Sequence, residues 1–265
     1  KALAREKGGI IKENTPVVTG VSQPSGRAVI KALAEQNAAD LFEYKKDFSI
    51  RKKSRADRYT YNGIFNSFKD LKKPLPGIHQ KENLSLALAA CELIFNKSAR
   101  TKPTIQLSLP LVADGLEKVN WPGRLEHIQD NPLVILDGAH NLHASKVLRH
   151  HLTATLGNRP LTLVVGILDD KPYEKMLSNL VACASRVIIT RADTDRSLDP
   201  RVLRQAVKKI SGVPVSIIED VKTAVSHAIE TSSDNDAVCV AGSLYVAGEA
   251  KEKFDKDLEQ KKNLK

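Results

Sequence analysis

The sequence is poor in the residues on which small secreted or metal-stabilised domains depend. Its 265 residues include three cysteines, one methionine and one tryptophan, and aromatic residues make up 5% of the chain. Cys91, Cys183 and Cys239 stand far apart in apolar runs and form no CxxC pair, which argues against a disulfide framework and a zinc site. We interpret them as small buried thiols of a reducing, cytoplasmic compartment.

Long apolar runs are also missing. No window approaches the roughly 18 uninterrupted apolar residues of a membrane span, and no signal peptide is recognisable, so no membrane partner is expected. The chain opens on KALAREKGGIIK, which is charged and has no initiator methionine. We interpret this opening as a position inside a longer protein.

Several catalytic signatures are absent as well. The sequence has no GxxxxGK[ST] loop and no GxGxxG loop, so it lacks either standard phosphate cradle. It also has no HExxH, GxSxG or protein-kinase signature. These absences exclude the commonest metalloprotease, hydrolase and kinase interpretations.

The chain has an excess of positive charge, with a formal net charge of +10. Such a charge suits nucleic acid, anionic lipid or anionic small molecules. The lysines are scattered, and the basic stretches lack the interleaved aromatic residues of a base-stacking surface. We therefore expect no nucleic-acid partner and favour an anionic small molecule.

The first part of the chain, residues 1–118, has mixed secondary-structure signals. The stretches FEYKKDFSIRKKS and DRYTYNG alternate in polarity and predict antiparallel strands. Proline and glycine predict a loop in PLPGIHQ, and KSARTKPT is a second predicted loop. The remaining predictions are helices over Ala2–Lys12, Ser25–Ala39 and Asn83–Phe95, and a short strand over Pro16–Gly20.

The second part, residues 119–265, alternates between apolar strand-like runs and helical patterns about four times. The runs are LVILDGA, LTLVVGIL, RVIITRA, VSIIED and AVCVAGSLYVAGE. Alternation of this kind predicts βαβ units, and apolar runs without polar alternation predict strands buried on both faces. The fold class is therefore α/β, with a Rossmann-like, mainly parallel sheet covered by helices on both faces.

Three of these predicted strands end in polar residues. The segments are DGAHN (Asp137–Asn141), GILDDK (Gly166–Lys171) and GSLY (Gly242–Tyr245). Ligands bind at the carboxyl ends of the strands in open parallel sheets, and glycines there allow close approach to the backbone. Three such ends on one sheet edge predict a binding cleft, although Asn141 could also serve as a helix cap.

Five motifs in order give this sequence a specific resemblance. They are REKGGIIK (Arg5–Lys12), GIHQKEN (Gly77–Asn83), WPGRLEHI (Trp121–Ile128) with LDGAHN (Leu136–Asn141), VVGILDDK and GSLYVAGE. Together they resemble the folylpolyglutamate and dihydrofolate synthases of the Mur ligase superfamily. The resemblance covers essentially the whole chain. It implies that residues 1–118 are the C-terminal part of a central ATP-binding domain and that residues 119–265 are the C-terminal domain.

The resemblance implies an ATP-dependent amide ligase. Such an enzyme would join L-glutamate to folate or dihydropteroate through an acyl phosphate, with ATP and Mg2+ as cofactors, and would act as a monomer. Cations around the γ-phosphate would stabilise this phosphoryl transfer.

It also implies residue roles. Arg124 would contact the phosphates, since a guanidinium presents a planar fork to phosphate oxygens. Asp137, Asn83 and Gln80 would contact ATP, and His140 would lie near the nucleotide and the incoming glutamate as a catalytic residue.

Two further assignments follow from the resemblance alone. Lys7 would be carbamylated, with catalytic and metal-binding roles, because a carbamate offers oxygen ligands to a hard cation such as Mg2+. Ser243 would help to hold the glutamate carboxylate. From the residue types alone, Lys7 is a surface helix lysine and Asn83 is a helix N-cap.

The sequence also departs from the family pattern. The phosphate-binding loop and the other metal ligands are absent, Gly8 stands where alanine is usual, and Leu142 stands where proline is frequent. This chain alone is therefore expected not to turn over ATP. Two alternatives stay open, namely a Mur-type ligase acting on UDP-muramyl peptides and a non-catalytic nucleotide-binding fragment.

Overall fold

The computed structural model of the 265-residue chain describes residues 1–53, 57–98 and 107–263. The chain divides into two compact units, each with its own core. Unit 1 comprises Lys1–Pro74 and His79–Asn120, and unit 2 comprises Leu75–Ile78 and Trp121–Lys265. No helix among the described residues combines the length and apolar character needed to cross a membrane.

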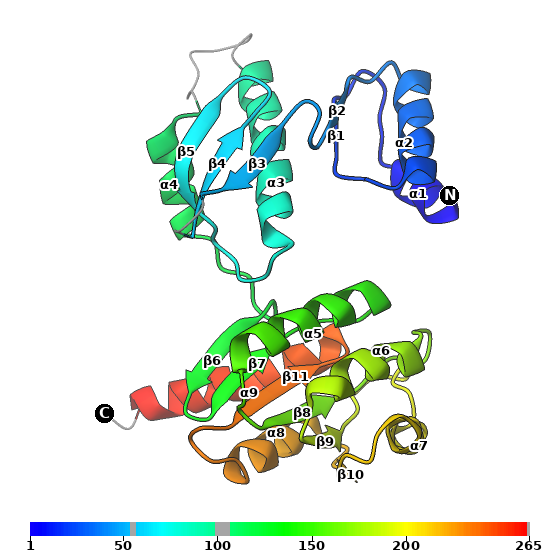
Figure 1. The fold of residues 1–265 in the computed structure, drawn as a ribbon, viewed down its shortest axis with the longest axis vertical. Helices are drawn as coiled ribbons and strands as arrows, with labels where there is room; N and C mark the ends of the chain where they lie inside the picture. Colours follow the sequence, from blue (N-terminus) through cyan, green and yellow to red (C-terminus); the bar gives the residue numbers. More distant parts are fainter. Residues whose placement is uncertain (54–56, 99–106, 264–265) are drawn as a thin grey trace. The chain divides into compact units, whose positions relative to one another are not determined.

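The first part of unit 1 is a small parallel pair of strands beside two helices (Figure 1). Strand β1 (Val17–Thr19) pairs in parallel with β2 (Leu41–Glu43), and helix α2 (Pro24–Gln36) connects them. Pro24 occupies the first turn of α2, where its missing N–H has no intrahelical partner to lose. Helix α1 (Ala2–Gly8) packs against α2, and the buried Gly8 faces the side chain of Leu33, which a β-carbon at position 8 would displace.

The second part of unit 1 is built on a three-stranded antiparallel sheet. Strands β3 (Ser49–Lys52), β4 (Arg58–Asn62) and β5 (Ser67–Lys72) lie in this order, and each has buried side chains on one face. Their apolar face packs with helices α3 (Gln80–Ser98) and α4 (Leu109–Glu117) in one core cluster. The antiparallel sheet portion expected from the sequence is therefore confirmed.

Unit 2 is a six-stranded sheet in the order β10–β9–β8–β11–β7–β6. All neighbouring strands are parallel except β6, which pairs antiparallel with β7 at the edge. The strands are β6 (Glu126–Asp130), β7 (Leu133–Leu136), β8 (Leu161–Val165), β9 (Arg186–Ile189), β10 (Val215–Ile217) and β11 (Ala237–Ala241).

Helices cover both faces of this sheet (Figure 1). Helices α5 (Leu142–Leu156), α6 (Tyr173–Leu180) and α7 (Pro200–Ile210) share one core with alternate strand residues, and the short 3-10 helix Val181–Cys183 follows α6. Helices α8 (Val221–Glu230) and α9 (Leu244–Asn263) share the other core. Because β7, β8, β9 and β11 each contribute to both cores, these central strands are apolar without alternation, and the predicted doubly covered sheet is confirmed.

Three sequence expectations need correction. The stretch that begins at Phe42 is expected from the sequence to be antiparallel throughout. Its first residues belong to β2, which pairs in parallel with β1, and only its later part, β3, is antiparallel. The apolar run that begins at Ala237 stops as a strand at Ala241, and its continuation LYVAGE opens helix α9. The loop expected at Lys97–Thr104 begins inside α3, and its remaining part lies outside the described residues.

Candidate functional site

The polar ends of strands β7, β8 and β11 meet at one edge of the sheet in unit 2. Strand β11 lies between β7 and β8, and all three run parallel. The chain crosses from β7 to β8 through α5 on one face, and it returns from β10 to β11 through α8 on the other face. This change of direction creates the kind of edge at which α/β sheets bind ligands.

Two glycines bring backbone against backbone at this edge. Gly242 has φ +105°, and a β-carbon there would lie 2.5 Å from the Gly166 carbonyl oxygen. A β-carbon on Gly166 would lie 2.7 Å from the Thr190 carbonyl oxygen. Only glycine fits such contacts, so the ends of β11, β8 and β9 are held together by their main chains.

The loop Gly123–Leu125 is fixed at the end of β7 by two sets of hydrogen bonds. The Gly138 amide donates to the Gly123 carbonyl over 2.7 Å, and the Leu125 amide donates to the Asp137 carboxylate over 3.0 Å. Both Gly123 and Leu125 have positive φ, and the Leu125 side chain is buried in the core. A non-glycine residue in this conformation persists only where its surroundings hold it.

Arg124 stands between these two fixed residues and is exposed. No hydrogen bond or ion pair joins its guanidinium to any of the described residues. The loop therefore presents at the sheet edge a cation that no ion pair holds, although the Asp137 carboxyl is close enough to interact with its charge. The planar fork of a guanidinium suits a phosphate.

Asp137 has a structural partner of its own. Burial raises the pKa of its carboxyl, and the amide hydrogen bonds from Leu125 and Ala139, together with Arg124 and His140, act in the opposite direction. Because its Oδ2 already accepts the Leu125 amide, this carboxylate connects β7 to the Arg124 loop.

His140 is oriented by the same segment. Its Nδ1 lies 3.0 Å from the Gly138 carbonyl oxygen, an arrangement in which Nδ1 carries the proton. The Asn141 amide nitrogen lies 3.4 Å from His140 Nε2, and Asn141 Oδ1 accepts the Ala144 amide over 2.8 Å. Asn141 is therefore the N-cap of α5, as its alternative sequence interpretation suggested.

Ser243 has no exposed surface. Its hydroxyl accepts the Tyr245 amide over 3.0 Å in the first turn of α9. A contact with a ligand carboxylate would require this side chain to move. The exposed side chains at this point of the edge are instead Leu244 and Tyr245.

In unit 1, Gln80 and Asn83 lie together at the start of α3. The Asn83 amide nitrogen donates to Gln80 Oε1 over 2.8 Å. Gln80 is 3% exposed, and its Nε2 finds no acceptor among the described residues. A buried amide donor without an acceptor costs free energy, so this N–H would gain from a ligand oxygen. As at Ser243, such a contact would require the surrounding side chains to move.

Lys7 is far from Gln80 and Asn83 in the sequence. It lies on the surface of α1. Its side chain is 72% exposed, and its ammonium lies 3.1 Å from the Glu6 carboxylate. Within the described ranges, no group of three or more His, Cys, Asp or Glu side chains could hold a metal ion. These residues therefore do not supply the ligand set that a carbamylated Lys7 would need.

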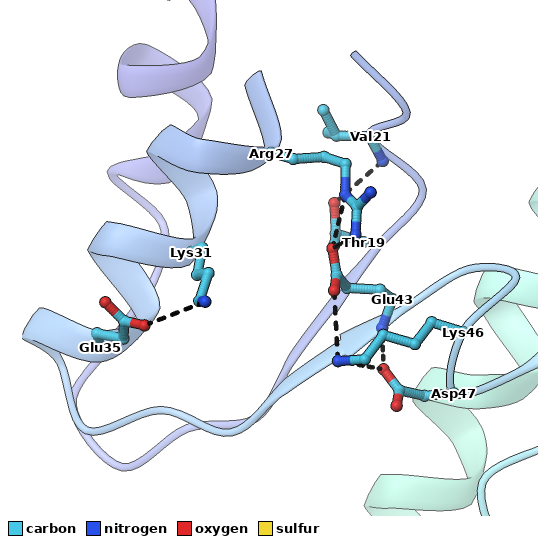
Figure 2. Close-up of polar contacts among 8 residues, drawn as sticks. All are labelled: Thr19, Val21, Arg27, Lys31, Glu35, Glu43, Lys46 and Asp47. Carbon is cyan, nitrogen blue, oxygen red and sulfur yellow. Dashed lines mark hydrogen bonds and ion pairs between the residues drawn. The ribbon is translucent and has the colours of Figure 1, made fainter. Parts of the chain in front are cut away.

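Unit 1 also has a groove of about 530 Å3 between α2 and β2. Figure 2 shows that its charged side chains pair with one another. Arg27 lies 2.7 Å from the Glu43 carboxylate, Lys46 lies 3.5 Å from it, and Lys31 pairs with Glu35. Because three cations and three acids line the groove, it offers no surplus charge to an ionic ligand. We interpret the Arg27–Glu43 pair as the contact that fixes α2 on β2.

Three residues of structural importance carry no separate role in the sequence interpretation. Glu126 accepts the Gly123 amide, Lys251 on α9 pairs with Glu126, and Glu92 is buried in unit 1. Glu126 belongs to the WPGRLEHI motif, which could have drawn attention to it. Lys251 has no local signal, because its partner lies far away in the sequence.

Comparison with known proteins places this geometry in a family. The family model of the Mur ligase, glutamate ligase domain matches residues 123–244. The dihydrofolate synthase/folylpolyglutamate synthase of Bacillus subtilis is 30% identical over 95% of this chain and 57% of its own length.

Solved structures agree with these sequence matches. The Thermotoga maritima folylpolyglutamate synthase is 34% identical, with a TM-score of 0.76 over 97% of this chain and 58% of its own. The Mycobacterium tuberculosis folylpolyglutamate synthase, complexed with ADP and AMPPCP, is 27% identical, with a TM-score of 0.84 over 96% of this chain and 59% of its own.

This chain therefore spans a little over half the length of the relatives it matches. Within that span the sequence, the antiparallel sheet of unit 1 and the mainly parallel sheet of unit 2 all agree with theirs. Over this span the chain is a homologue of the folylpolyglutamate and dihydrofolate synthases, and its residues 123–244 match the Mur ligase, glutamate ligase domain.

Proposed function

We propose that this chain is part of an ATP-dependent ligase that adds L-glutamate to folate, and to dihydropteroate, through an acyl-phosphate intermediate. The observation that carries the proposal is the Arg124 loop. It presents an unpaired guanidinium at the sheet edge of a chain homologous to folylpolyglutamate synthases.

The chemistry needs positive charge where negative charge develops. Activation of the carboxylate by ATP concentrates charge on the transferring phosphoryl group, and an arginine fork stabilises it by two parallel hydrogen bonds. Arg124 meets this requirement because its loop is held by hydrogen bonds and its guanidinium is free of ion pairs with the described residues. We assign it to the nucleotide phosphates.

The remaining nucleotide contacts come from α3. The Gln80 Nε2–H is buried and lacks an acceptor, which fits a donor reserved for a ligand oxygen. The adjacent Asn83 side chain fixes the orientation of this amide through Gln80 Oε1. We assign Gln80 and Asn83 to ATP, and Asp137 to the support of the Arg124 loop.

We also propose that His140 contacts the reacting groups. The Gly138 carbonyl orients its ring, and a fixed imidazole can accept a proton at Nε2 from the attacking amine. A divalent metal, when bound with ATP, would neutralise phosphate charge. The described residues around Lys7 do not complete a site for it, so we assign no step to the metal.

The complete reading frame that encodes this chain provides the test. It would be incubated with ATP, Mg2+, L-glutamate and either tetrahydrofolate or dihydropteroate, and phosphate release and product mass would be followed together. We expect phosphate release that depends on the pteridine and a product heavier by one glutamate.

Arg124→Ala should lower kcat/KM for ATP by about a hundredfold, as expected when a charged contact to the transition state is lost. Arg159→Ala is the matched control, because Arg159 is equally exposed but precedes β8 at the opposite end of the strand. Turnover with UDP-muramyl peptides in place of pteridines, or no turnover at all, would contradict the proposal.

A further inference from the structure

The loop that presents Arg124 is held from a third side by a carboxylate that the nucleotide assignment does not use. The Gly123 amide donates to Glu126 Oε2 over 2.7 Å. The Gly123 carbonyl also accepts the Gly138 amide, and the Leu125 amide donates to Asp137. Gly123 and Leu125, on either side of Arg124, are therefore both fixed through their main-chain atoms.

Glu126 is itself held by the last helix of the chain. Its second oxygen, Oε1, lies 3.0 Å from Lys251 Nζ on α9, and the two side chains are only 15% and 27% exposed. Lys251 also pairs with Asp255 over 3.0 Å, and these two carboxylates raise the pKa of the lysine against the effect of burial. The loop lies on the same helix, since a β-carbon on Gly123 would lie 3.7 Å from Ala247.

We infer that Lys251 is a positioning residue for the phosphate-binding arginine, acting through Glu126 and the Gly123 amide. One oxygen of Glu126 accepts the Gly123 amide of the loop, and the other oxygen contacts the Lys251 ammonium on α9. Because a half-buried ion pair is weakly screened by solvent, this connection holds the carboxylate in place more firmly than an exposed pair would. The inference rests on the proposed role of Arg124.

The connection is built for orientation rather than for charge at the ligand. Lys251 has its positive charge directed to Glu126 and Asp255. Its loss should let Glu126 leave the Gly123 amide, and the loop should then sample conformations in which Arg124 points elsewhere. Because Arg124 is assigned to the transferring phosphoryl group, the expected effect is a lower kcat/KM for ATP.

The test compares Lys251→Met, Lys251→Arg and Glu126→Gln in the complete reading frame. We expect Lys251→Met to lower kcat/KM for ATP about tenfold, which is less than the loss expected for Arg124→Ala. Glu126→Gln keeps an acceptor for Gly123 but loses the charge, so its effect should be similar or smaller. The double variant should match the single ones, because both act through one connection. Lys251→Arg should restore kcat/KM.

Lys253→Met is the matched control, because Lys253 forms an ion pair with Asp257 on the same helix at 2.7 Å and does not reach the loop. Hydrogen–deuterium exchange of the peptide that covers Gly123–Leu125 gives an independent readout. Exchange should quicken in Lys251→Met and stay unchanged in Lys253→Met.

Unchanged exchange and unchanged kcat/KM in Lys251→Met would overturn the inference. The two hypotheses fail separately. If Arg124→Ala leaves kcat/KM for ATP unaltered, the proposed function of the arginine is wrong, and the exchange measurement still decides whether Lys251 fixes the loop.

Discussion

At the scale of single residues, the most densely bonded side chain in the described structure is Glu92 on α3. It is 1% exposed and accepts hydrogen bonds from the Tyr61 hydroxyl at 2.8 Å and from the amides of Ile64, Phe65 and Asn66. These bonds close the turn between β4 and β5 around one carboxylate. Burial and this carboxylate strongly raise the pKa of Tyr61.

Glu92→Ala should therefore destabilise unit 1 severely. The change leaves one hydroxyl and three amides without their acceptor, and a loss of about 3–5 kcal/mol is expected for such a buried network. Urea unfolding followed by circular dichroism measures the loss.

Ser85→Ala is the control on the same helix. The Ser85 hydroxyl is fully buried but has no partner among the described residues, so its removal should change stability by less than about 1 kcal/mol. Equal losses for the two variants would contradict the importance of the Glu92 bonds.

The Asp137 carboxyl should make stability depend on pH. Burial raises its pKa in the folded chain, so the folded state binds the proton more tightly than the unfolded state does. Its contribution is favourable at low pH and is lost as pH rises from the ordinary value through the raised folded value. Asp137→Asn should remove this loss. The free energy of unfolding of the variant should therefore increase relative to that of the parent as pH rises through this window.

Asp220→Asn is the control of opposite sign. The Thr223 hydrogen bonds lower the pKa of Asp220, and its contribution is lost as pH falls through the folded value. Urea unfolding across acidic pH should show opposite slopes for the two variants relative to the parent. Parallel slopes would refute the assignment for Asp137.

At the scale of elements, the ends of β11 and β8 depend on a contact that no side chain makes. Gly242→Ala would place a β-carbon 2.5 Å from the Gly166 carbonyl in a left-handed conformation. We expect a loss of about 2–4 kcal/mol from steric clash and strain combined.

Gly248→Ala is the comparison within α9. No atom lies within 4 Å of its added β-carbon, and alanine favours a helix over glycine by about 1 kcal/mol. This variant should raise the melting temperature while Gly242→Ala lowers it. A rise for both would show that the close contact is unimportant.

The sequence predicted the strands of the second unit well, because β7, β8 and β11 are buried on both faces and read as apolar runs. It failed where an apolar run continues into a helix, as at Leu244, and where pairing is non-local, as between β1 and β2. The resemblance located Arg124, but the Lys251–Glu126 pair joins residues far apart and leaves no local pattern.

At the scale of the whole molecule, each of the two compact units encloses its own apolar clusters. Clusters that share no residues can unfold separately. A fragment of residues 121–265 should therefore unfold cooperatively in urea by itself.

The amides of strands β7, β8, β9 and β11 should exchange in that fragment at rates close to those in the full chain. Hydrogen exchange measures both. A fragment without cooperative unfolding would show that unit 2 depends on unit 1 for its stability.

The contact between Gly242 and Gly166 has a consequence for engineering. At this point the edge of the sheet is made of main-chain atoms, with no space for a side chain on either glycine. A ligand that reaches it meets carbonyl and amide groups that mutation cannot exchange. Any library aimed at new substrate preference should leave both glycines alone and vary the exposed positions beside them, namely Leu244 and Tyr245.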